Sequence, residues 1–173
     1  MPVRDALALL EQEGLVERAA RRWTRVVELS PALVEELVPL VSLLEQYGVS
    51  SAAAVALPAI AELRGANAEL REAIEAGDVR SASEADSRFH EGLVELAENR
   101  SLERALSEAR TRLRLLRPQV MKRDGAFDSV ADHDQIVECL EEGNRKAAAR
   151  ALAKNWRRGL ARFRASQATR PDD

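Results

Sequence analysis

The sequence is poor in aromatic side chains and contains a single cysteine. Aromatic residues make up 3% of the 173 residues, whereas hydrophobic residues make up 46%, and Ala, Leu, Glu and Arg are abundant. These four residue types favour helices, so the composition predicts an all-α protein. Cys139 has no second cysteine with which to form an internal disulfide, and we expect it to be an ordinary helical side chain in a reducing compartment.

The sequence also lacks an excess of charge of one sign and long apolar runs. The 26 basic and 29 acidic residues leave a net charge of -3, which gives no overall basic field, so any contact with DNA must be local. No uncharged apolar run approaches the roughly 18 residues that span a bilayer, and no signal-type segment begins the chain. We therefore expect a cytoplasmic protein with no membrane partner.

The first thirty residues predict a small unit made of one helix and a β-hairpin. Residues 2–13 carry apolar side chains at helical spacing and end before Gly14, which predicts a short amphipathic helix. Residues 15–16 and 23–29 are richer in β-forming side chains and predict the two strands of the hairpin. A hairpin of this size is only marginally stable by itself.

From Ser30 onward the pattern is helical. Ser30 followed by Pro31 is typical of a helix N-terminus, so we place a boundary between residues 1–30 and a second domain of residues 31–173. The second domain is expected to be an antiparallel helical bundle with one shared core, since the breaks between its helices are short. The predicted helices are residues 32–47, 49–56, 58–76, 79–98, 100–122, 129–142 and 144–166, with breaks at Gly48, Pro58, Gly77, Asn99, Asp124-Gly125 and Gly143.

Four polar residues fall on stripes that should face the bundle interior. Asp86 and His90 lie one helical turn apart on the apolar stripe of the same predicted helix, so their side chains address one point. His133 and Asn155 occupy inward positions of the last two helices. Two interpretations remain open: a buried ion pair with satisfied core polar groups, or a cavity that binds a metal or an acid. Asp oxygen and His nitrogen are suitable ligands for a divalent transition metal.

Three stretches together resemble the GntR family of bacterial transcription regulators, in the FadR-like branch that carries the helical effector-binding domain called FCD. Residues 86–90 and 97–102 are similar to the family's D-x-x-F-H and A-x-N-x-x-L motifs. Residues 131–144 are similar to H-x-x-I-x-x-A-x-x-x-G-D, and residues 2–16 resemble the recognition helix of a winged helix-turn-helix. The stretches cover most of the chain, and their order and spacing make the resemblance specific.

The resemblance implies a metal site, often zinc-like, beneath an effector pocket. The family's ligands are the Asp and His of the first motif, the His of the second motif and a further His on the last helix. The first three match Asp86, His90 and His133, but Asn155 stands where the family has the last His. An amide oxygen is a harder and weaker ligand than imidazole, so we expect metal binding to be weakened, to favour a different ion or to be lost.

The resemblance also implies a DNA-reading head, of which the last part is present: one helix and a hairpin wing. Arg4 stands where the family places a DNA-contacting arginine, and Arg21, Arg22 and Arg25 belong to a basic wing. The other interpretation of such a cluster is a solvated face. The family's Arg-Gly wing tip is absent, because Trp23 follows Arg22. We expect the support helix of the reader to be missing from the chain, which should then bind DNA weakly.

Together these features predict a ligand-responsive DNA-binding transcription regulator that works as a homodimer and senses a small-molecule effector in its helical domain. The alternative is a sensor module that has lost autonomous DNA binding. The family often has an arginine four residues before the glutamate of an early helix, where it meets an acidic effector. Val41 stands at that place before Glu45, so a carboxylate is one effector class among several. An enzyme is not expected, because the sequence shows no nucleophile motif or Gly-rich phosphate loop.

Overall fold

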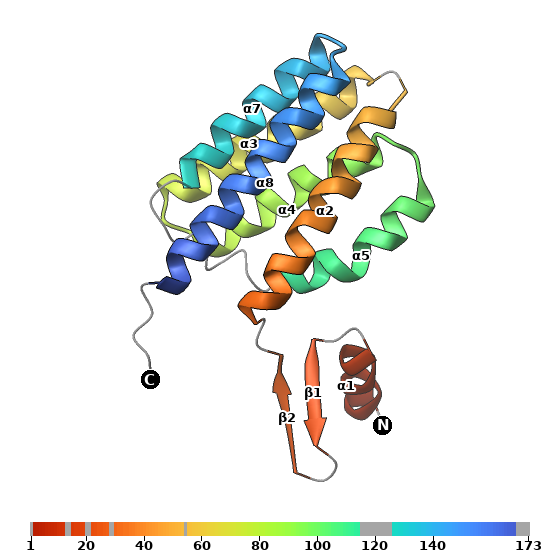
Figure 1. The fold of residues 1–173 in the computed structure, drawn as a ribbon, viewed down its shortest axis with the longest axis vertical. Helices are drawn as coiled ribbons and strands as arrows, with labels where there is room; N and C mark the ends of the chain where they lie inside the picture. The colour runs from red at the N-terminus through yellow and green to blue at the C-terminus, as the bar shows by residue number, and fades with distance from the viewer. Residues whose placement is uncertain are drawn as a thin grey trace.

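The chain is a bundle of long helices preceded by a short helix and a β-hairpin, as seen in a computed structural model (Figure 1). The structure describes residues 2–12, 15–19, 22–27, 30–53, 55–114 and 126–168. In these ranges the bundle consists of α2 (Pro31–Ser51), α3 (Leu57–Glu75), α4 (Val79–Glu95), α5 (Arg100–Arg114), α7 (Ala126–Glu141) and α8 (Arg145–Ala168). The predicted all-helical bundle is therefore confirmed.

Helix α4 lies at the centre of the bundle. It contacts α3, α2 and α5, while α8 packs between α2 and α7, and α7 also contacts α3. Phe89 and Leu93 of α4 are fully buried, as are Ile136 of α7 and Leu152 of α8. Burying an apolar side chain of this size contributes roughly 1.5–3 kcal/mol. The polar residues of α4 are thus fixed in position by the apolar side chains that flank them.

The N-terminal unit consists of α1 (Pro2–Gln12), β1 (Val16–Ala19) and β2 (Trp23–Val26). The two strands pair antiparallel, so the predicted hairpin is confirmed, and α1 packs against β1. None of the residues of α1 is buried. Ser30 begins α2 as predicted, because its hydroxyl oxygen accepts a hydrogen bond from the amide of Leu33 at 3.2 Å. The predicted turn at Gly14 lies outside the described residues.

The prediction of separate helices over residues 32–47 and 49–56 is wrong. Helix α2 continues through Gly48 to Ser51, and the described residues that follow it before α3 are not helical. A Cβ atom at Gly48 would lie only 3.0 Å from Cδ2 of Leu102, which is tighter than normal van der Waals contact. This glycine therefore allows α2 to approach α5 closely and does not end a helix.

Other predicted breaks are confirmed. Gly77 and Gly143 have φ values of 69° and 70°, the left-handed conformation in which helices commonly end. Asn99 accepts hydrogen bonds from the first amides of α5. Helix α7 begins three residues earlier than predicted, and the predicted helix over 115–122 and the Asp124-Gly125 break lie outside the described residues. Among the helices of the described ranges, none is long and apolar enough to cross a membrane.

Candidate functional site

A cluster of three ionisable side chains lies in the centre of the bundle. Asp86 and His90 extend from successive turns of α4, and His133 extends from α7. Their exposed fractions are 5%, 3% and 0%. The ring of Phe89 stacks on that of His133, with the centroids 3.7 Å apart and the planes nearly parallel, and this contact holds the imidazole in place. The structure thus brings together three of the four residues that the sequence predicted to converge.

The geometry of this cluster fits a metal ion. Nε2 of His90 lies 4.0 Å from Oδ1 of Asp86, and Nε2 of His133 lies 3.7 Å from the same oxygen. One ligand atom from each of the three residues lies within 4.8 Å of the other two. The two Nε2–Oδ1 separations are too long for hydrogen bonds. Two imidazole nitrogens and one carboxylate oxygen form a donor set suited to a divalent transition metal.

His90 is held from behind by Glu45, a fully buried carboxylate of α2. Nδ1 of His90 lies 2.8 Å from Oε2 of Glu45. Arg110 of α5 donates to Oε1 of Glu45 at 2.9 and 3.2 Å, and Nε1 of Trp156 donates to Oε2 at 2.7 Å. Burial raises the pKa of the Glu45 carboxyl, but His90, Arg110 and Trp156 together outweigh burial and hold this pKa below its ordinary value. Glu45 is thus an ionised carboxylate shared by side chains of three other helices.

His133 is held from behind by Asn67 of α3. Nδ1 of His133 lies 3.1 Å from Oδ1 of Asn67, which is 3% exposed. Nδ2 of Asn67 donates to the carbonyl oxygen of Val130 at 3.1 Å and to Oδ1 of Asp134 at 2.8 Å. The asparagine therefore links α3 to two consecutive turns of α7, one on each side of the histidine.

Helix α8 approaches the cluster through Trp156, whose indole centroid lies 4.9 Å from the ring centroid of His90. Asn155, the residue before Trp156, is 6% exposed. Arg162 lies farther along α8 and donates to Oγ of Ser129 at 2.7 Å. Burial lowers the pKa of Arg162, whereas three carboxylates, that of Asp86 first among them, act in the opposite direction. A cation of α8 therefore lies in the field of the cluster.

The hairpin arginines differ in their contacts. Arg25 forms an ion pair of 2.8 Å with Glu17, its cross-strand partner, and its guanidinium lies 4.7 Å from the ring centroid of Trp23. Arg4 and Arg22 are exposed and line one shallow depression on the surface of α1 and the hairpin. Arg21 lies outside the described residues. The expectation of a basic wing overlooked Glu17, which stands just before the basic run and pairs across the strands.

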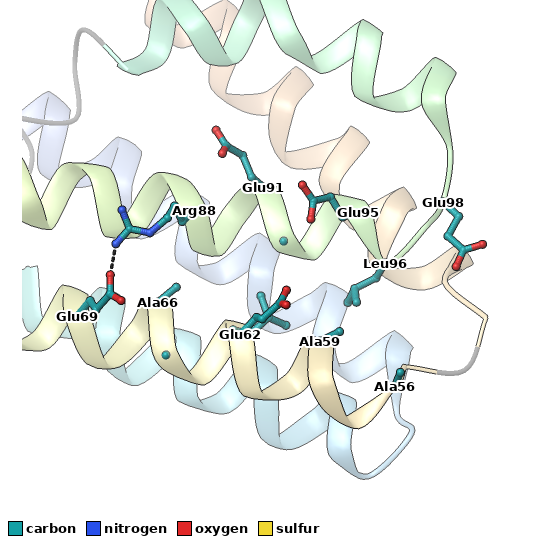
Figure 2. Close-up of a pocket in the computed structure, with 13 residues that line it drawn as sticks. Ala56, Ala59, Glu62, Ala66, Glu69, Arg88, Glu91, Glu95, Leu96 and Glu98 are labelled. Atoms are coloured by element: carbon teal, nitrogen blue, oxygen red, sulfur yellow. Dashed lines mark hydrogen bonds and ion pairs between the residues drawn. The ribbon is translucent and has the colours of Figure 1, made fainter.

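A groove of about 620 Å³ lies on the surface between α3 and α4 (Figure 2). Small side chains such as Ala59 and Ala66 line it together with Glu62, Glu69, Glu91, Glu95 and Glu98. Arg88 forms an ion pair with Glu69 at one end. Glutamates outnumber the single arginine of this lining, so the groove disfavours an anionic ligand. The charge of this groove therefore does not favour an acidic ligand there.

The sequence interpretation missed Glu45 and Asn67 as partners of the histidines. Both residues stand on inward stripes of their helices, Glu45 four residues after Val41 and Asn67 four residues after Leu63. Polar residues at such positions were a detectable signal, equal to the one that identified His133. Which histidine each would meet depends on how the helices pack, and the periodicity of a single helix does not determine that.

Comparison with known proteins gives consistent matches. The sequence profile described as the FCD domain matches residues 36–158. A probable D-xylose utilization operon transcriptional repressor of Paenarthrobacter nicotinovorans is 32% identical over 151 residues, which cover 87% of this chain and 67% of the relative. An uncharacterized HTH-type transcriptional regulator of Agrobacterium vitis, from the TAR-I ttuE-ttuC' intergenic region, is 36% identical over 100 residues, which cover 56% of this chain and 58% of the relative.

The fold is also that of solved structures. A GntR transcriptional regulator from Rhodococcus sp. RHA1 matches with a TM-score of 0.80 and 20% sequence identity, over 98% of this chain and 80% of that chain. A likeness at this identity concerns the arrangement of the helices. The chain spans about two thirds or less of the length of the two curated relatives, so what it shares with them is a part of each protein.

Proposed function

Since the chain belongs to the GntR family of transcriptional regulators and carries the family's FCD domain, we propose that its helical part senses a small-molecule effector with the help of a divalent metal. Its relatives are transcriptional regulators and not enzymes, as the sequence led us to expect. In this proposal residues 31–173 form the effector-binding domain, and residues 1–30 form the last part of a winged helix-turn-helix. The regulator acts in the cytoplasm, where it meets its operator.

The convergence of three ligand atoms from Asp86, His90 and His133 is the observation that carries the metal centre. These residues would hold the ion, and Asn155 would supply a weak fourth ligand or leave that position to the effector. A bound divalent ion supplies a Lewis acid that attracts a carboxylate or hydroxyl group. The buried position of the cluster supports a structural or sensory ion with restricted access.

A zinc titration followed by thermal unfolding tests this centre. We expect zinc to raise the melting temperature of the wild type, because an ion that binds only the folded state stabilises it by mass action. This rise in melting temperature should be absent in His133→Ala. If the wild type and His133→Ala shift equally with zinc, His133 has no role in the response. Arg64→Ala is a suitable control. It removes a surface ion pair with Glu141, in which both side chains are partly exposed.

Arg162 supports a carboxylate effector. Val41, which stands where the family often has an effector-binding arginine, is fully buried and packs in the apolar contact between α2 and its neighbours. Arg162 donates to Oγ of Ser129, one turn before His133 on α7, and this contact supports a cation of α8 near the cluster instead. A carboxylate bound between the metal and this guanidinium would be neutralised from both sides.

The proposal includes a homodimer that contacts DNA through the N-terminal unit. On α2 the side chains of Leu40, Leu43 and Tyr47 are 48%, 65% and 55% exposed and follow each other at helical spacing. Such a stripe can pair with its own copy across a two-fold axis. Arg4 and Arg22 would contact phosphates together with Arg21, while the ion pair with Glu17 reduces the share of Arg25.

Light scattering checks the homodimer and, with DNA added, the contact of the N-terminal unit with a duplex. The chain should have the mass of a dimer at tens of micromolar, and Leu43→Glu should convert it to a monomer, unlike Leu57→Glu, which changes an exposed leucine on α3.

With a DNA duplex at low salt, complex formation should be weak and should fall steeply as salt rises. Arg22→Ala should weaken it more than Arg25→Ala. A monomeric wild type, or equal effects of the two arginine variants, would contradict these assignments.

A further inference from the structure

Both histidines of the cluster form hydrogen bonds through the same ring atom. Nδ1 of His90 lies 2.8 Å from Oε2 of Glu45, and Nδ1 of His133 lies 3.1 Å from Oδ1 of Asn67. In both rings the other nitrogen, Nε2, is the atom nearest to Oδ1 of Asp86. The two rings stand at 82° to each other with their centroids 5.4 Å apart. They therefore approach the carboxylate from different directions but with equivalent atoms.

The contact with Glu45 determines where His90 carries its proton. Both oxygens of Glu45 act as acceptors, because Arg110 donates to Oε1 and Trp156 to Oε2, so Nδ1 of His90 is the donor. The carboxylate cannot rotate away, because Arg110 donates to one of its oxygens and Trp156 to the other. Arg110 also donates to the carbonyl oxygen of His90 at 2.8 Å, which fixes the backbone that carries the ring. A neutral His90 held in this way has its lone pair on Nε2.

The contact with Asn67 determines which ring nitrogen of His133 carries the proton. An amide can present either its oxygen or its NH₂ group, and the partners of the group decide which. The carbonyl oxygen of Val130 and the carboxylate of Asp134 are both acceptors, so the NH₂ group must face them. The amide oxygen then faces His133, whose Nδ1 must donate. A neutral His133 therefore also has its lone pair on Nε2.

Two nitrogen lone pairs and a carboxylate directed toward one point favour a cation, a proton or a metal ion, between them. We propose that Glu45 and Asn67 are positioning residues that select Nε2 as the donor atom of both histidines and so set the metal affinity of the cluster. This inference rests on the proposed metal function. Second-layer acceptors that orient ligating histidines have this effect on metal sites in general.

The proton positions can be measured without metal. The chain contains two histidines, so a long-range ¹H–¹⁵N spectrum of the metal-free protein at mildly alkaline pH shows two imidazole systems. Both rings are expected to carry the proton on Nδ1. A proton on Nε2 of either ring would overturn the role of the residue behind it.

Asn67 is the better residue to vary, because Glu45 also holds Arg110 and Trp156. Asn67→Leu keeps the approximate size of the side chain but removes the acceptor, and we expect zinc affinity to fall by about 10- to 100-fold. The double variant Asn67→Asp with Asp134→Asn reverses the polarity of the 67–134 hydrogen bond and keeps an acceptor for Nδ1 of His133, although the carbonyl oxygen of Val130 loses its donor. It should restore the Nδ1 proton and part of the affinity.

Calorimetric zinc titration of the wild type and both variants separates the possible failures. Unchanged affinity in Asn67→Leu would overturn the positioning role. Equal loss in the single and double variants would assign the effect to packing and would overturn it as well. Absence of zinc binding by the wild type would overturn the metal centre itself, whereas the spectrum of the metal-free protein would still report the ring protons.

Discussion

Replacing Glu45 with glutamine is expected to lower the free energy of unfolding by about 3–5 kcal/mol, the usual cost of removing one partner from a buried charged pair. Glu45 is fully buried and accepts hydrogen bonds from Arg110, His90 and Trp156. An amide at this position must turn its NH₂ group toward at least one of these donors. The guanidinium of Arg110 would also lose its counter-charge. Urea unfolding of the metal-free protein, followed by circular dichroism, measures the loss.

Glu35→Gln is the matched control for this variant. Glu35 lies on the same helix and also pairs with an arginine, Arg164, but its side chain is 37% exposed. Exposed ion pairs contribute little to stability, so this variant should unfold nearly as the wild type does. If Glu45→Gln were no less stable than Glu35→Gln, the buried carboxylate would not be the common partner of the three donors.

The difference between wild type and Glu45→Gln should also depend on pH. The pKa of Glu45 in the folded state lies below its ordinary value, so its contribution to stability is fully present above the pKa of the unfolded chain. The contribution is lost as the pH falls through the folded pKa. The two proteins should therefore differ most near neutral pH and converge in acid. A constant difference over that range would contradict the assignment of an ionised Glu45.

Asn155→His is expected to produce the largest gain in metal binding. A histidine would then stand on α8 at the position that corresponds to the family's fourth ligand, and each tenfold rise in affinity corresponds to about 1.4 kcal/mol. At zinc concentrations about 100 times the dissociation constant, the bound ion stabilises the fold by about 2.7 kcal/mol. Calorimetric titration and thermal unfolding with and without zinc measure both effects.

The double variant Asn155→His with His133→Ala should lose this gain, because one ligand is then exchanged for another. The competing interpretation, in which the four residues are satisfied core polar groups, makes the opposite prediction. It expects Asn155→His to be neutral or destabilising whatever metal is added, since the larger imidazole would be forced into a packed interior. Absence of zinc-dependent stabilisation in Asn155→His would leave the residues as a buried polar cluster.

The shared face of Asp86 and His90 could be predicted from helical spacing, and the inward position of His133 from the apolar residues around it, while the resemblance to the GntR family joined the three. Residues four apart share one face, and that face was identified by the apolar side chains around it. The contacts of Glu45 with His90 and of Asn67 with His133 span 45 and 66 residues of sequence. Such contacts depend on the rotation of each helix against its neighbours, which the pattern of one helix does not contain.

Gly48 was misread for a similar reason. A glycine ends a helix when its backbone adopts a left-handed conformation, as Gly77 and Gly143 do. The same residue can instead remain helical where another side chain approaches too closely for a Cβ atom, as Leu102 does at Gly48. The glycine itself does not distinguish the two cases, and at Gly48 the neighbouring helix decides.

Helix α2 is continuous from Pro31 to Ser51, with Pro39 inside it, and can transmit a tilt along its length. Its first residue follows the hairpin, and Glu45 is held among three other helices, 14 positions farther along. At 1.5 Å per residue the arm between them is about 21 Å long. A tilt of about 5° at Glu45 would therefore displace the start of the helix by about 2 Å. A movement of α2 as one body about Glu45 would therefore be largest at the end of the helix that adjoins the hairpin.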